Sequence, residues 1–181
     1  LRTRDYTFPA ADPKYEMSLS GQGDKYIKFL SEELVPLLDK QYPIDPLQRT
    51  LYGHSLAGYL VDYALLQTLE SGKGVFQGFI AASPSLHYNN YYLLNSLEKM
   101  KVTTAKGVSV KVFQSFGQLE DEEDAHDPEI QKVNETVEAI ERILLSKKIS
   151  LHSKALIFSN LGHMETAIPT FLKGLNWIHN N

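Results

Sequence analysis

Four strand-like runs alternate with helical stretches along this chain, and this alternation constrains the fold more than any other feature. The strand-like runs cover residues 49–52, 75–82, 108–116 and 153–159. Helical spacing of apolar residues covers 24–40, 59–69, 89–100, 129–145 and 165–179. Strands that alternate with helices predict a parallel sheet with crossover helices. We therefore expect a single domain of the α/β class, with ligands bound beyond the carboxyl ends of the strands.

The composition excludes several functional classes. The 181 residues carry a formal net charge of -4 with no run of lysine or arginine, which argues against a nucleic-acid binder. No apolar stretch reaches the roughly 20 residues that a membrane span needs. The absence of cysteine excludes disulfides, thiol nucleophiles and thiolate metal sites. It leaves the compartment open, and our expectation is a bacterial cytoplasm or periplasm.

The hexapeptide Gly53-His54-Ser55-Leu56-Ala57-Gly58 has the pattern of a nucleophile elbow, a sharp turn between a strand and a helix. On such a turn the serine is strained and its hydroxyl stands clear of the sheet. The strand and the helix come so close that the positions two before and two after the serine must be small. Gly53 meets this demand, whereas Ala57 stands where glycine is usual and Gly58 follows one place later. An ordinary turn is the alternative, so the partners of the serine must decide.

Two candidate partners follow later strands. A serine hydroxyl needs a base to take its proton, and the base needs an acid group to hold its tautomer. His163 follows the last predicted strand, and Glu120 lies in the loop 117–127 after the third. The order serine, acid, histidine is that of α/β-hydrolases. The loop is rich in carboxylates, so Asp121, Asp124 or no acid at all remain alternatives to Glu120.

Several segments recur together as landmarks of one family. They are Gly53-His54-Ser55-Leu56-Ala57-Gly58, Ala82-Ser83-Pro84-Ser85-Leu86 with Asn89-Asn90, Gly117-Gln118-Leu119-Glu120, Gly162-His163 and Arg2-Thr3-Arg4-Asp5-Tyr6-Thr7. In this combination the chain resembles the Putative esterase family of α/β-hydrolases, and within it the enterobactin-esterase-like branch of siderophore trilactone hydrolases. The likeness covers essentially the whole chain. It departs at Ala57 and at His87-Tyr88, where the family often has a pair of aromatic residues.

The resemblance implies an α/β-hydrolase fold and a serine esterase that works without a cofactor. In such an enzyme Ser55 would be the nucleophile, His163 the base and Glu120 the acid. The backbone N–H of Leu56, the residue after the nucleophile, would be one donor of the oxyanion hole.

The resemblance also implies that part of the family's domain precedes this sequence. Members carry several strands before the segment that residues 2–7 resemble, including the loop with the second oxyanion-hole donor. No matching segment precedes Leu1. We therefore expect residues 1–181 to be the C-terminal part of a larger catalytic domain, which alone would be poorly soluble or inactive because its first strand exposes an edge.

Other polar residues are candidates for binding. His87 and Tyr88 follow the second strand and are expected to line the substrate pocket, and Arg4 is expected to meet an anionic substrate group. His126 lies among the carboxylates of the loop 117–127, but the spacing matches neither an EF-hand nor a zinc site, so no metal is expected. His54 is expected to pack beneath the elbow.

The expected partner is a small-molecule ester, for example a siderophore lactone, with no nucleic acid and no membrane span. An acyltransferase or a thioesterase would use the same residues on the same scaffold. A catalytically inactive α/β-hydrolase relative used for binding is the third reading. The oligomeric state is left open.

Overall fold

The computed structural model describes residues 1–15, 17, 19–100, 109–147 and 150–180. Within these ranges the parallel sheet consists of β1 (Thr50–His54), β2 (Gly78–Ala82), β3 (Ser109–Gly117) and β4 (Ser150–Phe158). The order of the strands across the sheet is their order along the chain. Each neighbouring pair is parallel, so the carboxyl ends of all four strands lie at one edge. The predicted α/β architecture is confirmed. Val108, the predicted first residue of the third strand, lies outside the described residues.

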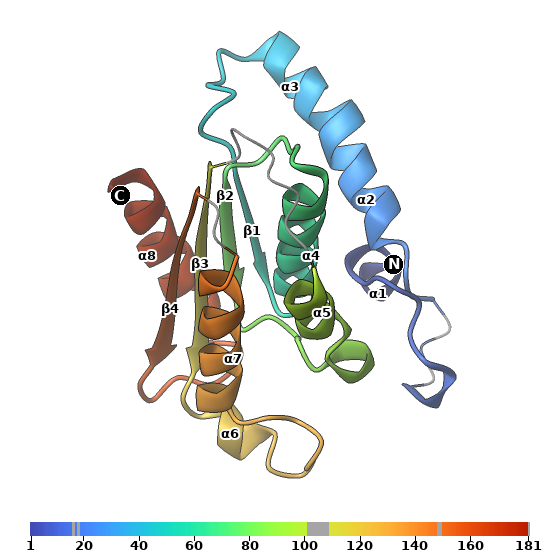
Figure 1. Ribbon diagram of the computed structural model, residues 1–181, viewed down its shortest axis with the longest axis vertical. Coiled ribbons are helices and arrows are strands. Elements are labelled where there is room, and N and C mark those ends of the chain that lie inside the picture. Colours follow the sequence, from blue (N-terminus) through green and yellow to red (C-terminus); the bar gives the residue numbers. More distant parts are fainter. Residues whose placement is uncertain (16, 18, 101–108, 148–149, 181) are drawn as a thin grey trace.

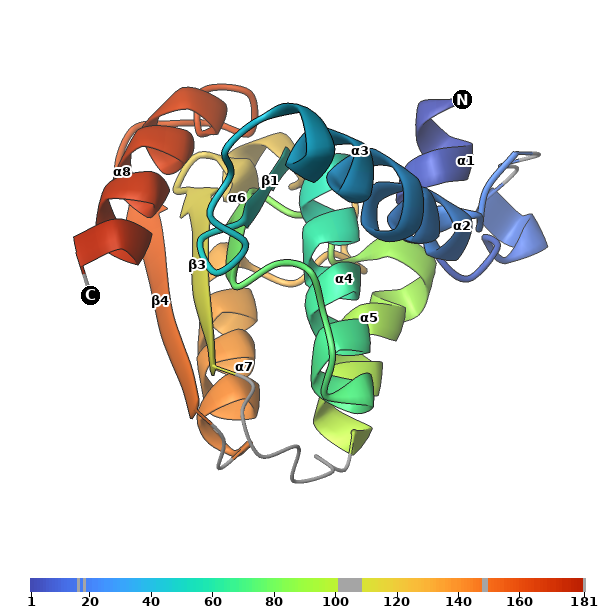
Figure 2. The ribbon, with the colours of Figure 1, turned by 90° about the horizontal axis from the view of Figure 1, so that it is seen from above.

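Helices cover both faces of this sheet (Figures 1 and 2). α4 (Leu56–Ser71), α5 (Tyr88–Lys99) and α7 (Val133–Leu145) lie on one face, and α8 (Ala167–Asn180) lies on the other. Alternate residues of β3 serve the two cores: Val112 packs in the first and Phe113 in the second. No helix in the described ranges is long and apolar enough to span a membrane.

The chain before β1 runs past α4 in a series of helical segments. α1 (Arg2–Tyr6) and a 3₁₀ turn, η1 (Pro13–Tyr15), are helical segments that precede the first helix expected from the apolar spacing. The predicted helix from residue 24 is confirmed as α2 (Gly23–Phe29) and α3 (Val35–Gln41), joined by a π-helical turn, η2 (Leu30–Leu34). The helix thus widens just before Pro36, which has no N–H to donate to a preceding turn.

α7 begins later than the sequence pattern indicates. The pattern predicts a helix from Glu129, but α7 starts at Val133. The Glu129 N–H donates to Asp127 Oδ1 at 3.0 Å, and the Val133 N–H donates to Asp121 Oδ1 at 2.8 Å. Side chains of Asp127 and Asp121 therefore accept from these two N–H groups, and the helix starts at Val133, the residue that makes the second bond.

Candidate active site

Ser55 lies on the sharp turn between β1 and α4. Its backbone angles are φ 61° and ψ -124°, in a region that residues with a side chain rarely adopt. The end of β2 and the segment after it hold this backbone. The Ser55 N–H donates to the Ala82 carbonyl at 2.9 Å, and the Ser85 N–H donates to the Ser55 carbonyl at 3.3 Å. These two hydrogen bonds stabilise the strained backbone of the elbow. They also place Ser55 at the carboxyl edge of the sheet.

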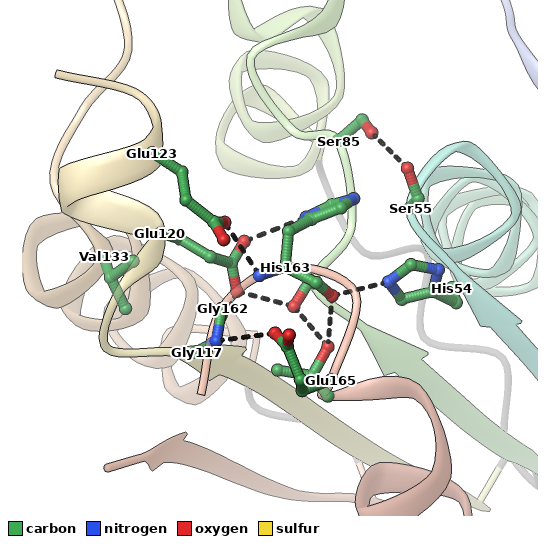
Figure 3. A network of polar contacts seen from close by, with 12 residues as sticks. His54, Ser55, Ser85, Gly117, Glu120, Glu123, Val133, Gly162, His163 and Glu165 are labelled. Carbon is green, nitrogen blue, oxygen red and sulfur yellow. Dashed lines mark hydrogen bonds and ion pairs between the residues drawn. The ribbon is translucent and has the colours of Figure 1, made fainter. Parts of the chain in front are cut away.

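Glu120 and His163 meet at the same edge (Figure 3). Glu120 begins the short helix α6 (Glu120–Glu123) after β3, and His163 lies between β4 and α8. Glu120 Oε2 is 3.1 Å from His163 Nδ1. Glu120 is only 7% exposed, and its Oε1 accepts hydrogen bonds from the Ser83 hydroxyl at 2.6 Å and from the Gly117 N–H. Both oxygens of this buried carboxylate are therefore engaged.

These bonds fix the charge of Glu120 and the tautomer of His163. Burial alone would raise the pKa of Glu120, but the hydrogen bonds from His163, Ser83 and Gly117 outweigh burial and lower the pKa below its ordinary value. The ionised carboxylate accepts the hydrogen on His163 Nδ1, which leaves Nε2 as the basic nitrogen. The hydrogen bond to Glu120 raises the pKa of His163 against the opposing effect of burial.

The Ser55 hydroxyl lies next to a second hydroxyl. Ser55 Oγ is 3.4 Å from Ser85 Oγ, and Ser85 is buried in the segment after β2. In the view of Figure 3 the His163 ring lies between Glu120 and this pair of serines. The structure thus brings Ser55, Glu120 and His163, which the sequence predicts as partners, to one edge of the sheet from three different strands.

A cavity of about 540 Å³ adjoins Glu120. His87, a predicted substrate contact, lines it together with Leu86 and Tyr91. Much of the remaining wall is acidic and consists of Asp121, Asp124, Asp127, Glu129 and Glu135. Burial raises the pKa of Asp124 above its ordinary value.

The other two predicted substrate contacts do not line this cavity. Tyr88 is buried, donates its hydroxyl hydrogen to the Pro9 carbonyl at 2.9 Å and packs its ring edge-on against Tyr59. These are the contacts of a core residue. Arg4 lies in α1 and pairs with Asp5 at 2.7 Å. A substrate-binding role for either residue stays a prediction.

Within the described part of the chain, no group of three or more His, Cys, Asp or Glu side chains could hold a metal ion. His126, the histidine of the acidic loop, places its Nδ1 3.0 Å from the Glu123 carbonyl oxygen. Its ring therefore takes part in the hydrogen bonding of its own loop.

A parallel sheet with a strained serine after β1, a buried carboxylate after β3 and a histidine after β4 is the arrangement of the α/β-hydrolase fold. The chain belongs to the Putative esterase family, whose sequence model matches residues 3–144. It is 28% identical over 172 residues to the ferri-bacillibactin esterase BesA of Bacillus subtilis (strain 168), an alignment that covers 90% of this chain and 56% of that protein. The predicted family is thereby confirmed, and a siderophore esterase is among the relatives of the chain.

Solved structures show the same fold. The BES protein from Bacillus cereus matches 98% of this chain with a TM-score of 0.73 and 26% identity. The siderophore hydrolase EstA from Aspergillus nidulans matches 99% of it with a TM-score of 0.81 and 19% identity. The chain covers 63% of the first of these proteins and 66% of the second, so it spans only part of the length of its relatives.

Three polar residues of the site escape a reading of the sequence alone. They are Ser83, which binds Glu120, Ser85, which lies next to Ser55, and Glu123. The Oε2 atom of Glu123 accepts a hydrogen bond from the His163 N–H at 2.8 Å. The segment 82–86 was a landmark of the family resemblance, but a sequence does not show which hydroxyl meets which group. Glu123 lies in a run of carboxylates, and the side chains of such a run usually only contact solvent.

Proposed function

We propose that this chain forms the catalytic part of a serine hydrolase that cleaves carboxylic esters, with Ser55 as nucleophile, His163 as base and Glu120 as acid. One observation carries the proposal: a strained elbow serine shares the carboxyl edge of the sheet with a buried carboxylate that is hydrogen-bonded to a histidine. Membership in the Putative esterase family supports it.

The proposed reaction is acyl transfer to water. Ser55 Oγ attacks the ester carbonyl carbon while His163 Nε2 takes its proton, and ionised Glu120 stabilises the imidazolium. The tetrahedral intermediate collapses when the alcohol leaves with the proton from His163, and an acyl-serine remains. Water then gives a proton to His163 as its oxygen attacks the acyl carbon. When the bond between this carbon and Ser55 Oγ breaks, His163 returns the proton to Ser55 Oγ, which releases the carboxylic acid and restores both residues.

Leu56 would stabilise the charge that develops on the carbonyl oxygen. It is the first residue of α4, so its N–H belongs to the helix N-terminus, where no earlier turn supplies an acceptor. The dipole of this 16-residue helix adds positive potential at the same place. A backbone donor in this position is fixed before the reaction begins, which is how an oxyanion hole lowers the barrier.

We also propose a siderophore ester as the substrate class. The support is the 28% identity to BesA, a protein whose name describes a ferri-bacillibactin esterase. Mass spectrometry of products from a ferric siderophore trilactone tests this proposal. A siderophore joined only by amide bonds is the control, and cleavage of simple esters without cleavage of the trilactone would reject this substrate class alone.

The catalytic proposal is tested on the full-length protein, by labelling with a fluorophosphonate and by turnover of a short p-nitrophenyl ester. Ser55→Ala is expected to abolish labelling and to lower turnover by about 10³-fold or more. Ser71→Ala, an exposed serine at the end of the same helix, should leave both unchanged. Full labelling and turnover in Ser55→Ala would show that another residue is the nucleophile.

The same assay separates the rival functions. An acyl-serine that transfers its acyl group to an added alcohol or thiol in preference to water indicates an acyltransferase, and faster turnover of thioesters indicates a thioesterase. A folded full-length protein with neither labelling nor turnover indicates a binding module.

A further inference from the structure

Side chains from two other elements contact the two main-chain polar groups of His163, its N–H and its carbonyl (Figure 3). Its N–H donates to Glu123 Oε2 at 2.8 Å, and its carbonyl oxygen lies 2.8 Å from His54 Nε2. Glu123 comes from α6, and His54 is the last residue of β1, directly before Ser55. The Thr166 hydroxyl, one turn further along, also reaches this carbonyl at 3.0 Å.

The contact with His54 fixes a tautomer. A carbonyl oxygen only accepts, so His54 Nε2 must carry the hydrogen that it donates. Burial lowers the pKa of His54, which favours the neutral ring. The two histidine rings lie 4.8 Å apart between their centroids. The expectation that His54 packs beneath the elbow is thus refined, because the residue before the nucleophile contacts the loop of the base.

The contact with Glu123 requires a glycine at position 162, directly before His163. A β-carbon on Gly162 would clash with the Glu123 carboxylate, so the glycine provides the space in which this side chain lies. The Gly162 N–H donates to Glu165 Oε2 at 2.9 Å, so Glu165 takes the neighbouring donor. Two carboxylates therefore bind two successive N–H groups of the same short turn.

From these contacts we propose that Glu123 and His54 are positioning residues for His163: they fix its main chain while Glu120 fixes its ring. The proposal rests on the proposed function, in which His163 is the catalytic base. Glu120 alone would let the ring follow any movement of the loop that carries it. Contacts from α6 and β1 tie that loop to the two elements that carry the acid and the nucleophile, and a base acts efficiently only at a fixed place.

Glu123 can act on His163 in two ways, which must be separated. Its charge acts on the pKa of the ring, and its length lets the carboxylate reach the His163 N–H. The titratable groups that face His163 are Glu120, Glu123 and Asp124 from the α6 segment, His54 from β1, and His87 after β2. The three carboxylates raise the pKa of His163. Removal of the Glu123 charge should therefore lower this pKa, whereas removal of its reach should displace the loop.

Two conservative variants make this separation in the full chain, with a short p-nitrophenyl ester as substrate. Glu123→Asp keeps the charge but is one methylene too short, and we expect kcat to fall by about 10-fold to 100-fold with KM within about two-fold. Glu123→Gln keeps an acceptor oxygen at the same reach. We expect it to keep most of kcat and to shift the acid limb of the kcat/KM profile to lower pH. Glu122→Asp and Glu122→Gln, exposed on the same helix, are the controls and should change neither quantity.

His54 is tested in the same way. His54→Leu keeps bulk without a donor and should lower kcat by about 10-fold to 100-fold at unchanged KM, whereas His54→Gln keeps an N–H at similar reach and should restore most of the rate. His152→Leu, at an exposed position in β4, is the control. If the melting curve shows that His54→Leu does not fold, His54→Asn replaces it, because its amide is too short to reach the carbonyl.

Wild-type kcat in both Glu123→Asp and a folded His54 variant without the donor would overturn the proposal, and so would a loss confined to KM. Failure of the proposed function gives a different result. In that case Ser55→Ala also keeps its turnover and its fluorophosphonate labelling.

Discussion

No β-carbon fits between Gly53 and the carbonyl oxygen of Ala57. On the other side of the elbow, a β-carbon on Gly58 would lie 3.1 Å from the Ala82 carbonyl oxygen and from the Pro84 α-carbon, closer than side chains normally pack. Gly53 and Gly58 are therefore the two positions of the elbow at which another stretch of backbone comes too close for a side chain to pack normally. Ala57 lies within α4, which accommodates its methyl group, so alanine at the usual place of glycine is compatible with the elbow.

Gly53→Ala is expected to break this turn. The added methyl meets backbone, which cannot move aside as a flexible side chain can, so we expect the free energy of unfolding to fall by about 2 kcal/mol or more. Fluorophosphonate labelling should be lost with it. Urea unfolding and the labelling rate check both effects. Ala57→Gly is the control: it should keep its labelling and lose only about 1 kcal/mol, the cost of glycine inside a helix. A normal labelling rate in Gly53→Ala would contradict the argument.

A strained turn at the start of α5 gives a second prediction. Asn89, Asn90 and Tyr91 have left-handed backbone angles, with φ of 52°, 55° and 56°. Asn90 Oδ1 also accepts hydrogen bonds from Lys14 Nζ at 3.0 Å and from the Tyr15 hydroxyl at 2.9 Å. Alanine avoids this conformation more strongly than asparagine, and glycine adopts it freely. Asn90→Ala should therefore be less stable than Asn90→Gly by about 1 kcal/mol in urea unfolding. Equal stability of the two variants would mean that the side-chain bonds, not the backbone, set the cost.

Asp62 should make the stability of the fold depend on pH. The Gln114 amide donates to Asp62 Oδ1 at 2.7 Å, and Oδ2 is buried without a hydrogen-bond partner in the described residues. Burial raises the pKa of Asp62 to about 7. Between pH 4 and 7, roughly, the folded state keeps a proton that the unfolded state has released. The free energy of unfolding therefore falls as pH rises through this range, by up to about 4 kcal/mol from this group.

The variant Asp62→Asn removes this titration. Relative to the wild type it should gain stability as pH rises from about 4 to 8, which urea unfolding at several pH values measures. Glu138→Gln, an exposed carboxylate on α7, is the control and should follow the wild type. A stability difference between Asp62→Asn and the wild type that stays constant with pH would show that Asp62 is ionised in the folded state as well.

The order of strands and helices could be predicted because each element has its own signal. The buried helix α4 is apolar almost all round and the buried strand β2 is a continuous apolar run, and the elbow between β1 and α4 has small residues at fixed places. The start of α7 could not be predicted, because the bonds that delay it come from Asp121 and Asp127. The left-handed turn of α5 also escaped, since local propensity favours a helix there and contacts with the segment 10–15 support the turn.

The candidate site divides in the same way. Ser55 and His163 could be predicted because each follows a strand within a short, specific motif. Glu120 had rivals in its own loop, and only the folded chain shows that its carboxylate is the one that meets His163 Nδ1. Ser83 and Glu123 act through hydrogen bonds across 37 and 40 positions of sequence, and such contacts leave no local pattern.

The variant Glu120→Gln tests whether Glu120, and not a neighbouring carboxylate, is the acid partner of His163. The wild-type carboxylate accepts the His163 Nδ1 hydrogen and raises the pKa of that ring. As the proposed base, His163 works only while its ring is neutral. The rate kcat/KM therefore falls as pH drops through the pKa of His163. In Glu120→Gln that pKa is lower, so the acid limb should move to lower pH, while kcat falls by about 10²-fold to 10⁴-fold because a neutral amide does not stabilise the imidazolium. Glu122→Gln should keep the wild-type profile. An unchanged rate in Glu120→Gln would move the role of the acid to Asp124 or remove it altogether.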